Sequence, residues 1–117
     1  MAREGEIELA WAAGFYDGEG GCYAHLDKRD GAIRIQISLK QVDIRPLERF
    51  KKAVGVGNIR GPYQGNKAYH QGQYRWYAYS QNAYTFLEKI YDYLSEPKKE
   101  QIDRVLLKIE ENKKERL

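Results

Sequence analysis

Two carboxylates, Asp17 and Glu19, stand at the end of a stretch that has the composition of a buried helix. Gly20 and Gly21 follow them, so the helix is expected to end there. A carboxylate in this place faces the negative end of the helix dipole, which disfavours its charge. A divalent cation held by carboxylate oxygens would compensate, and such an ion supports hydrolysis of phosphate esters. The alternative is a core helix that ends in solvated acids and a glycine cap.

The helix that must position these acids carries a stripe of small residues. Ala10, Gly14 and Gly18 recur every four positions and therefore share one face. A bare face of this kind lets two helices approach closely. Because the stripe has no use in a monomer, we expect it to pack against a second copy of the chain, with Ala13 and Asp17 at the same interface.

Length and composition predict one domain over residues 1–117, with flexible ends at 1–6 and 111–117. The single cysteine, Cys22, excludes an internal disulfide and fits a reducing compartment. No apolar run is long enough to cross a membrane, and no signal peptide is apparent. We therefore expect an intracellular protein, in the cytoplasm or an organelle matrix.

The net charge of +3 is spread unevenly. Residues 1–20 carry one basic and five acidic side chains, residues 21–80 carry eleven basic and four acidic, and residues 81–117 carry eight of each. We therefore expect the middle segment, residues 21–80, to contact a polyanion if the protein binds one. A solvated basic face is the alternative.

Residues 21–28 and 33–40 have the alternating pattern of two strands, joined by a turn at Arg29-Asp30-Gly31. Four aliphatic side chains of the second strand are expected to point inward. Its outward side chains are expected to be Arg34, Gln36, Ser38 and Lys40, and those of the first strand include Tyr23 and His25. A two-stranded ribbon with such a polar, cationic face suits the major groove of DNA.

The rest of the chain continues the alternation of helices and strands. Asp43 is the expected N-cap of a helix to about residue 54, and Ser80 the expected cap of a third helix. Strands are expected over about 57–63 and 73–80, a polar loop over 64–72, and a last helix after Ser95-Glu96-Pro97. The order αββαββα plus a final helix predicts an α+β domain, with helices on one face of a four-stranded antiparallel sheet.

In the fourth strand, side chains alternate between the core and the outer face of the sheet. If Trp76 points to the core, then Arg75 and Tyr77 point outward, with Arg60 nearby. Six aromatic residues lie in 63–79, and on a sheet these are more often core and cross-strand pairs than platforms for bases. We expect Trp76 and Tyr79 in the core, while Tyr77 fits the core or the outer face equally well.

Residues 12–20, AAGFYDGEG, resemble the motif that names the LAGLIDADG homing endonucleases. Seven of the nine positions are identical or close in kind, and the exceptions are Ala12 and Tyr16. Glu19 keeps the carboxylate of the motif's last acid. The resemblance extends over about residues 9–109, since the order of elements matches and three junctions are similar: Gln41-Val42-Asp43, the segment 54–59 and the segment 97–101. It is the single-motif arrangement.

The resemblance implies a site-specific endonuclease for double-stranded DNA, encoded within an intron or intein. It would act as a homodimer on a long pseudo-palindromic site, with Mg²⁺ (Mn²⁺ substituting) and no small-molecule cofactor. Glu19 would be the metal ligand, with the neighbouring carbonyl of Gly18. Gln41 would orient a water, Lys98 or Lys99 would stabilise charge, and Asp17 would be structural.

Two other classes compete with this interpretation. One is a binding module that does not cleave, such as an intron RNA maturase or a regulator on the same scaffold. Its sign would be loss of the motif acid or of the junction residues, and Glu19, Gln41 and the lysines are present. The other is a plain dimeric structural protein, which leaves the one-sided polar ribbon unexplained.

Overall fold

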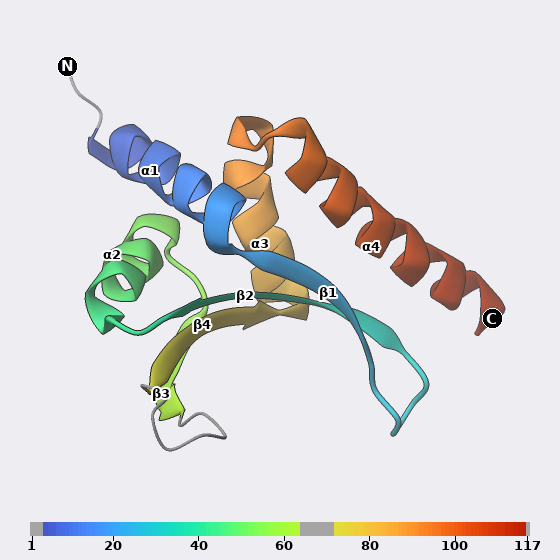
Figure 1. Cartoon of the computed structure of the whole chain (residues 1–117). Helices are drawn as coiled ribbons and strands as arrows, with labels where there is room; N and C mark the ends of the chain where they lie inside the picture. The colour runs from blue at the N-terminus through green and yellow to red at the C-terminus, as the bar shows by residue number, and fades with distance from the viewer. Residues whose placement is uncertain (1–3, 64–71, 117) are drawn as a thin grey trace.

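The computed structural model describes residues 4–63 and 72–116 of the chain. The elements follow in the order α1 (Glu4–Glu19), β1 (Gly21–Leu26), β2 (Ile33–Gln41), α2 (Ile44–Val54), β3 (Asn58–Tyr63), β4 (Gln73–Tyr79), α3 (Ser80–Ile90), a 3₁₀ turn (Tyr91–Tyr93) and α4 (Glu96–Glu115) (Figure 1). Most of the polar loop expected over 64–72 lies outside the described residues.

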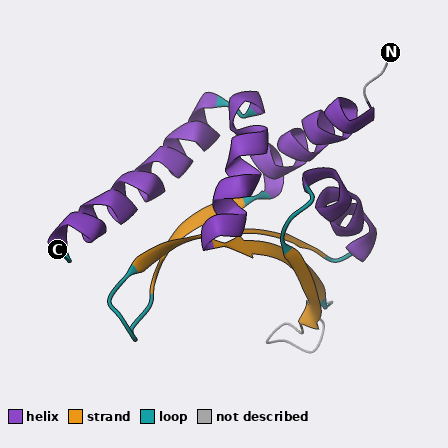
Figure 2. Ribbon diagram, turned by 180° about the vertical axis from the view of Figure 1, so that it is seen from behind, coloured by secondary structure: helices purple, strands orange, loops and turns teal. Residues whose placement is uncertain are grey.

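The four strands form one antiparallel sheet in the order β1-β2-β4-β3. All the helices lie on one side of it, and the sheet is arched so that its ends turn away from them (Figures 1 and 2). The expected α+β architecture is therefore confirmed. Of the helices that the structure describes, none is both long and apolar enough to cross a membrane.

The core fills the space between the sheet and the helices. Ile35, Ile37 and Leu39 of β2 are buried there, as the alternation predicted. Trp76 of β4 is fully buried, with its ring centroid 4.7 Å from that of Phe50 on α2. The orientation predicted for β4 is thus confirmed, and the opposite, concave face of the sheet is left to polar side chains.

The ends of α2 and α3 differ in how they are capped. Asp43 accepts a hydrogen bond from the backbone N–H of Arg45, and Gly55 closes α2 with φ 76°, so the predicted N-cap is confirmed. The cap predicted at Ser80 is wrong, because Ser80 is the first residue of α3 and Tyr79 is its N-cap. β4 runs directly into α3, and the sharp change of direction gives Ser80 a φ of 47°.

The C-terminal segment differs from expectation. Residues 111–117 were expected to be loose, yet α4 continues to Glu115. The apolar pattern of the helix stops at Ile109, so burial gives no signal beyond it. The segment is instead held by a polar contact, in which Ile33 donates its N–H to Asn112 Oδ1 at 3.0 Å. The first helix begins at Glu4, within the residues 1–6 that were expected to be flexible.

Candidate cleavage site and nucleic-acid interface

The last turn of α1 presents Glu19 to solvent. Glu19 and Gly18 are both exposed, and the carbonyls of a helix's last turn lack partners within the helix. Asp17 is engaged differently, because its Oδ1 accepts from the backbone N–H and the hydroxyl of Ser95, each at 2.9 Å. Asp17 therefore ties the end of α1 to the start of α4 within one chain.

The structure distinguishes the two adjacent lysines at the start of α4. Lys98 Nζ donates to the carbonyl of Gly20 at 2.7 Å and lies 5.4 Å from the centre of the Tyr16 ring. Lys99 turns away and lies 3.7 Å from the carboxylate of Glu96. Of the two lysines, Lys98 lies beside the end of α1, where it contacts Gly20, the residue that follows Glu19.

Gln41 is placed at the same end of the sheet. The β1–β2 ladder begins with Gly21 opposite Ser38, and Gln41 is the last residue of β2. Since the strands are antiparallel, Gln41 lies past the start of β1. Glu19 and Lys98 thus lie where α1 passes into β1, and Gln41 lies three residues beyond the β2 partner of Gly21.

The small-residue stripe of α1 is bare in the single chain. Ala10, Gly14 and Gly18 are exposed, and a Cβ added at either glycine would meet nothing within 4 Å. Ala13 corrects the expectation, because it is only 1% exposed and belongs to the core of its own chain. The free face of α1 therefore consists of Ala10, Gly14 and Gly18, extended by Ile7, which is 57% exposed.

Three cationic residues form a row across the concave face. Lys40 on β2 lies directly opposite Arg75 on β4, and Arg75 lies opposite Arg60 on β3. Like charges placed opposite each other destabilise a sheet. A polyanion on this face would relieve that repulsion. We call Lys40, Arg75 and Arg60 the cation row.

Tyr77 lies beside the cation row and is only 8% exposed. Its hydroxyl accepts from Arg60 Nε at 2.6 Å, and the Arg75 guanidinium lies 5.3 Å from its ring centre. Tyr77 is therefore an outer-face residue that arginines cover. Tyr79, expected in the core, shares this face and is 42% exposed, so that expectation is wrong. Residues two apart in a strand point to the same side.

The outward residues of the β1–β2 ribbon are unequally accessible. Tyr23 is 53% exposed, and His25 is exposed as well. Gln36 is half-buried between its cross-strand neighbours Tyr23 and Tyr79. Ser38 corrects the expectation of an open reading face, because it is 8% exposed where it lies between Gly21 and Tyr77.

Arg34, expected as a free cation, is held by two acids of the hairpin. Its guanidinium lies 3.0 Å from Asp27 and 2.6 Å from Asp30. Hydrogen bonds from the Arg29 side chain and backbone hold the pKa of Asp27 far below its usual range, and the bond from Arg34 lowers the pKa of Asp30. From the sequence, Asp27 was expected on the outer face of the first strand and Asp30 in the turn, and nothing local shows that either reaches Arg34.

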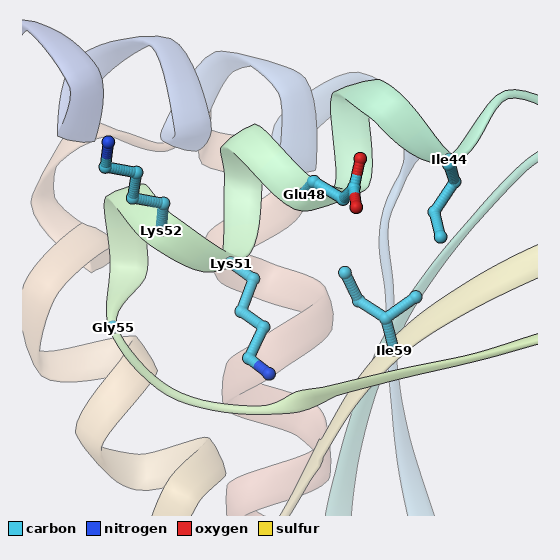
Figure 3. Close-up of a pocket in the computed structure, with 6 residues that line it drawn as sticks. All are labelled: Ile44, Glu48, Lys51, Lys52, Gly55 and Ile59. Carbon is cyan, nitrogen blue, oxygen red and sulfur yellow. The ribbon is translucent and has the colours of Figure 1, made fainter.

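Other polar groups are placed away from this chemistry. A hollow on the helix side of the sheet is lined by six residues of α2, β3 and the turn between them, Ile44, Glu48, Lys51, Lys52, Gly55 and Ile59 (Figure 3). It holds one carboxylate, that of Glu48, and two lysines. Burial raises the pKa of the Cys22 thiol to about 12, so the thiol stays protonated. Within residues 4–63 and 72–116, no three His, Cys, Asp or Glu side chains gather as a metal cage.

The fold can be compared with solved structures. The homing endonuclease I-CvuI, in complex with the I-CreI target in the presence of Mg with the DNA not cleaved, matches with a TM-score of 0.71 and 22% identity, over 97% of this chain and 72% of that chain. I-CvuI with its own target in the presence of Ca matches with a TM-score of 0.65 and 24% identity, over 92% and 68%. The LAGLIDADG meganuclease I-CpaMI bound to uncleaved DNA matches with a TM-score of 0.66 and 15% identity, over 94% and 40%. No family model and no curated protein matches the sequence. The chain has the fold of the LAGLIDADG homing endonucleases, as the resemblance of its motif implied.

Proposed function

We propose that this chain is a site-specific endonuclease for double-stranded DNA, a LAGLIDADG homing endonuclease of the kind encoded within introns or inteins. It would act inside the cell as a homodimer on a long pseudo-palindromic site. One observation carries the proposal: the cation row lies on a concave sheet face free of helices, while the exposed Glu19 stands one residue before Gly20, whose carbonyl holds Lys98. The fold shared with proteins solved on DNA supports it.

The concave face would bind the duplex. The cation row would neutralise phosphates and so supply affinity without regard to sequence. The β1–β2 ribbon is narrow enough for the major groove, where Tyr23, His25 and Gln36 would meet base edges. The charge of the face and the polarity of the ribbon thus provide the two components that sequence-specific binding needs.

The residues at the end of α1 fit half of a divalent metal site. Glu19 supplies one exposed carboxylate, and the Gly18 carbonyl lies in the last turn beside it. Mg²⁺ is held by one or two carboxylates together with waters and substrate phosphates, and Mn²⁺ accepts the same oxygen donors. Glu19 of a second copy, brought close by packing of the two bare stripes, would complete the set. When bound, such an ion activates water and offsets charge on the scissile phosphate.

The chain's own side chains would assist at this place. The ammonium of Lys98, fixed by the Gly20 carbonyl, would stabilise negative charge that develops on the phosphate. Gln41 would hold a water in line for attack through its amide. Both would act only on DNA that the concave face has already positioned, since neither group alone binds a duplex.

The decisive experiment is cleavage of a randomised plasmid library in Mg²⁺ by the wild type and by Glu19→Gln. This change keeps the size of the side chain and removes its charge, so cleavage should disappear while binding in Ca²⁺ persists. Glu88→Gln, on the exposed side of α3, is the matched control and should cleave normally. Cleavage by Glu19→Gln at the wild-type rate would reject the role of this carboxylate. Sequence-specific binding without cleavage by the wild type, under any divalent ion, would favour a maturase or a regulator.

A further inference from the structure

The β1–β2 hairpin extends beyond the part of the sheet that other strands support. The β2–β4 ladder begins with Gln36 opposite Tyr79, where β4 ends and α3 begins. Residues 33–35 of β2 therefore lie past the end of β4 on that side. Arg34, with its two acids, is on this overhanging part. An overhanging hairpin needs a further support if it is to hold a side chain in one place.

Asn112 of α4 provides a contact where β4 has ended. Its Oδ1 accepts from the N–H of Ile33 at 3.0 Å, and its Nδ2 donates to the carbonyl of Gly31 at 3.2 Å. The single amide of Asn112 thus bonds to the backbone on both sides of Ala32, between the turn and β2. The residues are 79 and 81 positions apart in sequence, so this contact closes a long loop of the chain.

The apolar packing around Asn112 is incomplete. Ile109, one turn earlier on α4, is buried and borders a hollow between α4 and β2, and the exposed Lys113 and Arg116 line the same hollow farther along the helix. Packing therefore fixes α4 as far as Ile109, and the amide of Asn112 makes the connection from there to the hairpin. The tip of the hairpin is also braced from within, since Asp30 accepts from the N–H of Ala32 at 2.9 Å while it holds Arg34.

We infer that Asn112 is a positioning residue for sequence reading: it anchors the hairpin so that Asp27 and Asp30 present the Arg34 guanidinium to one base pair. The inference rests on the proposed function. A guanidinium held in one orientation by carboxylates loses little freedom when it meets guanine, so its bidentate contact discriminates well between bases. Without the anchor, Arg34 would still attract phosphate but would discriminate poorly.

The test combines hydrogen exchange with DNA selection, using Asn112→Ala and, as control, Asn82→Ala on the exposed side of α3. In the free protein, Asn112→Ala should speed exchange of the Ile33 amide and of the hairpin, and Asn82→Ala should not. Asn112→Asp keeps the acceptor for Ile33 and should retain protection of that amide. This second variant tests the anchor even if Asn112→Ala proves unstable.

Binding is then measured in Ca²⁺ on the duplex that the wild type selects from a random library and on an unrelated duplex. Asn112→Ala should lower the affinity for the selected duplex about 3- to 10-fold, which corresponds to loss of one or two hydrogen bonds. It should change the affinity for the unrelated duplex less than about twofold. In an Arg34→Ala background the same change should have no further effect, since the two residues act as one unit.

Equal weakening of both duplexes, or an effect that adds fully to that of Arg34→Ala, would overturn the inference. So would hairpin exchange that Asn112→Ala leaves unchanged. If the wild type selects no duplex at all, the proposed function fails and the reading role of Arg34 falls with it. The exchange experiment distinguishes the cases, because it reports on the anchor without DNA.

Discussion

At the scale of single residues, adjacent residues of a helix make different contacts because their side chains point in different directions. Lys98 and Lys99 are adjacent, and successive helix residues are rotated by about 100°. Lys98 reaches the Gly20 carbonyl beside the end of α1, while Lys99 lies over the Tyr91 ring, 5.5 Å from its centre. The pattern of residue types left this choice open, and the orientation of α4 favours Lys98.

Paired alanine variants test this assignment. Lys98→Ala should lower the rate of DNA cleavage about 10- to 100-fold or more, by analogy with the loss of one donor that stabilises a transition state, while DNA affinity changes little. Lys99→Ala should cleave within about twofold of the wild type, since its ammonium faces Glu96. Single-turnover cleavage of a bound duplex measures both. Equal rates for the two variants would remove Lys98 from the site.

The hairpin acids give the fold a defined response to acid. The pKa of Asp27 and of Asp30 is lowered in the folded chain by hydrogen bonds from Arg29 and Arg34. Below the ordinary pKa of a carboxyl, about 3.9, the unfolded chain therefore binds protons that the folded chain does not. Their stabilising contribution is present above that pH and is lost as the pH falls toward the folded-state values.

This linkage predicts the pH dependence of unfolding. The free energy of unfolding should fall as the pH is lowered from about 5 toward 2. Asp27→Asn should be less stable than the wild type at pH 7 and should lose less on acidification, because one of the coupled carboxyls is gone. Urea unfolding at pH 7, 4 and 2.5 measures the slopes. Parallel curves for the two proteins would show that Asp27 is not linked to folding.

At the scale of elements, the glycines in α1 and just after it are of two kinds. Gly14 lies on the bare face, where an added Cβ meets open space. Gly20 lies against the Tyr16 ring, which an added Cβ would strike. The ring is fully buried and its hydroxyl donates to the Gly21 carbonyl, so it cannot move aside at low cost. Gly14 is thus free for the proposed assembly, whereas Gly20 is required by the fold.

Substitutions at these glycines separate the two roles. Gly14→Ala should stabilise the single chain by about 0.5–1 kcal/mol through helix propensity. Gly14→Leu should leave the chain folded but push the paired helices apart and yield monomer. Gly20→Ala should destabilise the fold itself. Sedimentation and thermal unfolding together measure these effects. A folded wild-type monomer at micromolar concentration would contradict the role of the stripe in dimerisation.

The features of these elements that the sequence predicted correctly are those set by burial. The alternation of β2 and the inward position of Trp76 on β4 were predicted correctly, because one side of each strand is buried. The continuation of α4 to Glu115 and the engagement of Arg34 depend on polar contacts between side chains whose partners lie far away or around a turn. Such contacts leave no periodic signal. For the same reason the covered state of Ser38 and Tyr77 could not be anticipated.

At the scale of the whole molecule, the sheet separates a side covered by helices from a concave side that is free of them (Figure 1). The helices fill one side of the sheet (Figure 2). The concave side carries the cation row. Basic residues occur on both sides: Lys40 is on the concave face, and Lys51 lines the hollow on α2 (Figure 3). Net charge alone would let either side attract DNA. The proposed interface requires that only the concave side make close phosphate contacts.

The salt dependence of binding tests that requirement with one matched pair. Each phosphate neutralised contributes about −0.9 to the slope of log K against log salt. Lys40→Ala should therefore reduce the magnitude of the slope by about 1 and weaken selected and unrelated duplexes alike. Lys51→Ala removes the same charge from the helix side and should change the slope little, because at physiological salt a charge beyond about 8 Å from the phosphates is largely screened. Titrations in Ca²⁺ over a range of salt concentrations measure both slopes. A larger change for Lys51→Ala than for Lys40→Ala would place the DNA on the helix side, which is covered by α1–α4 and offers the duplex no ribbon to read.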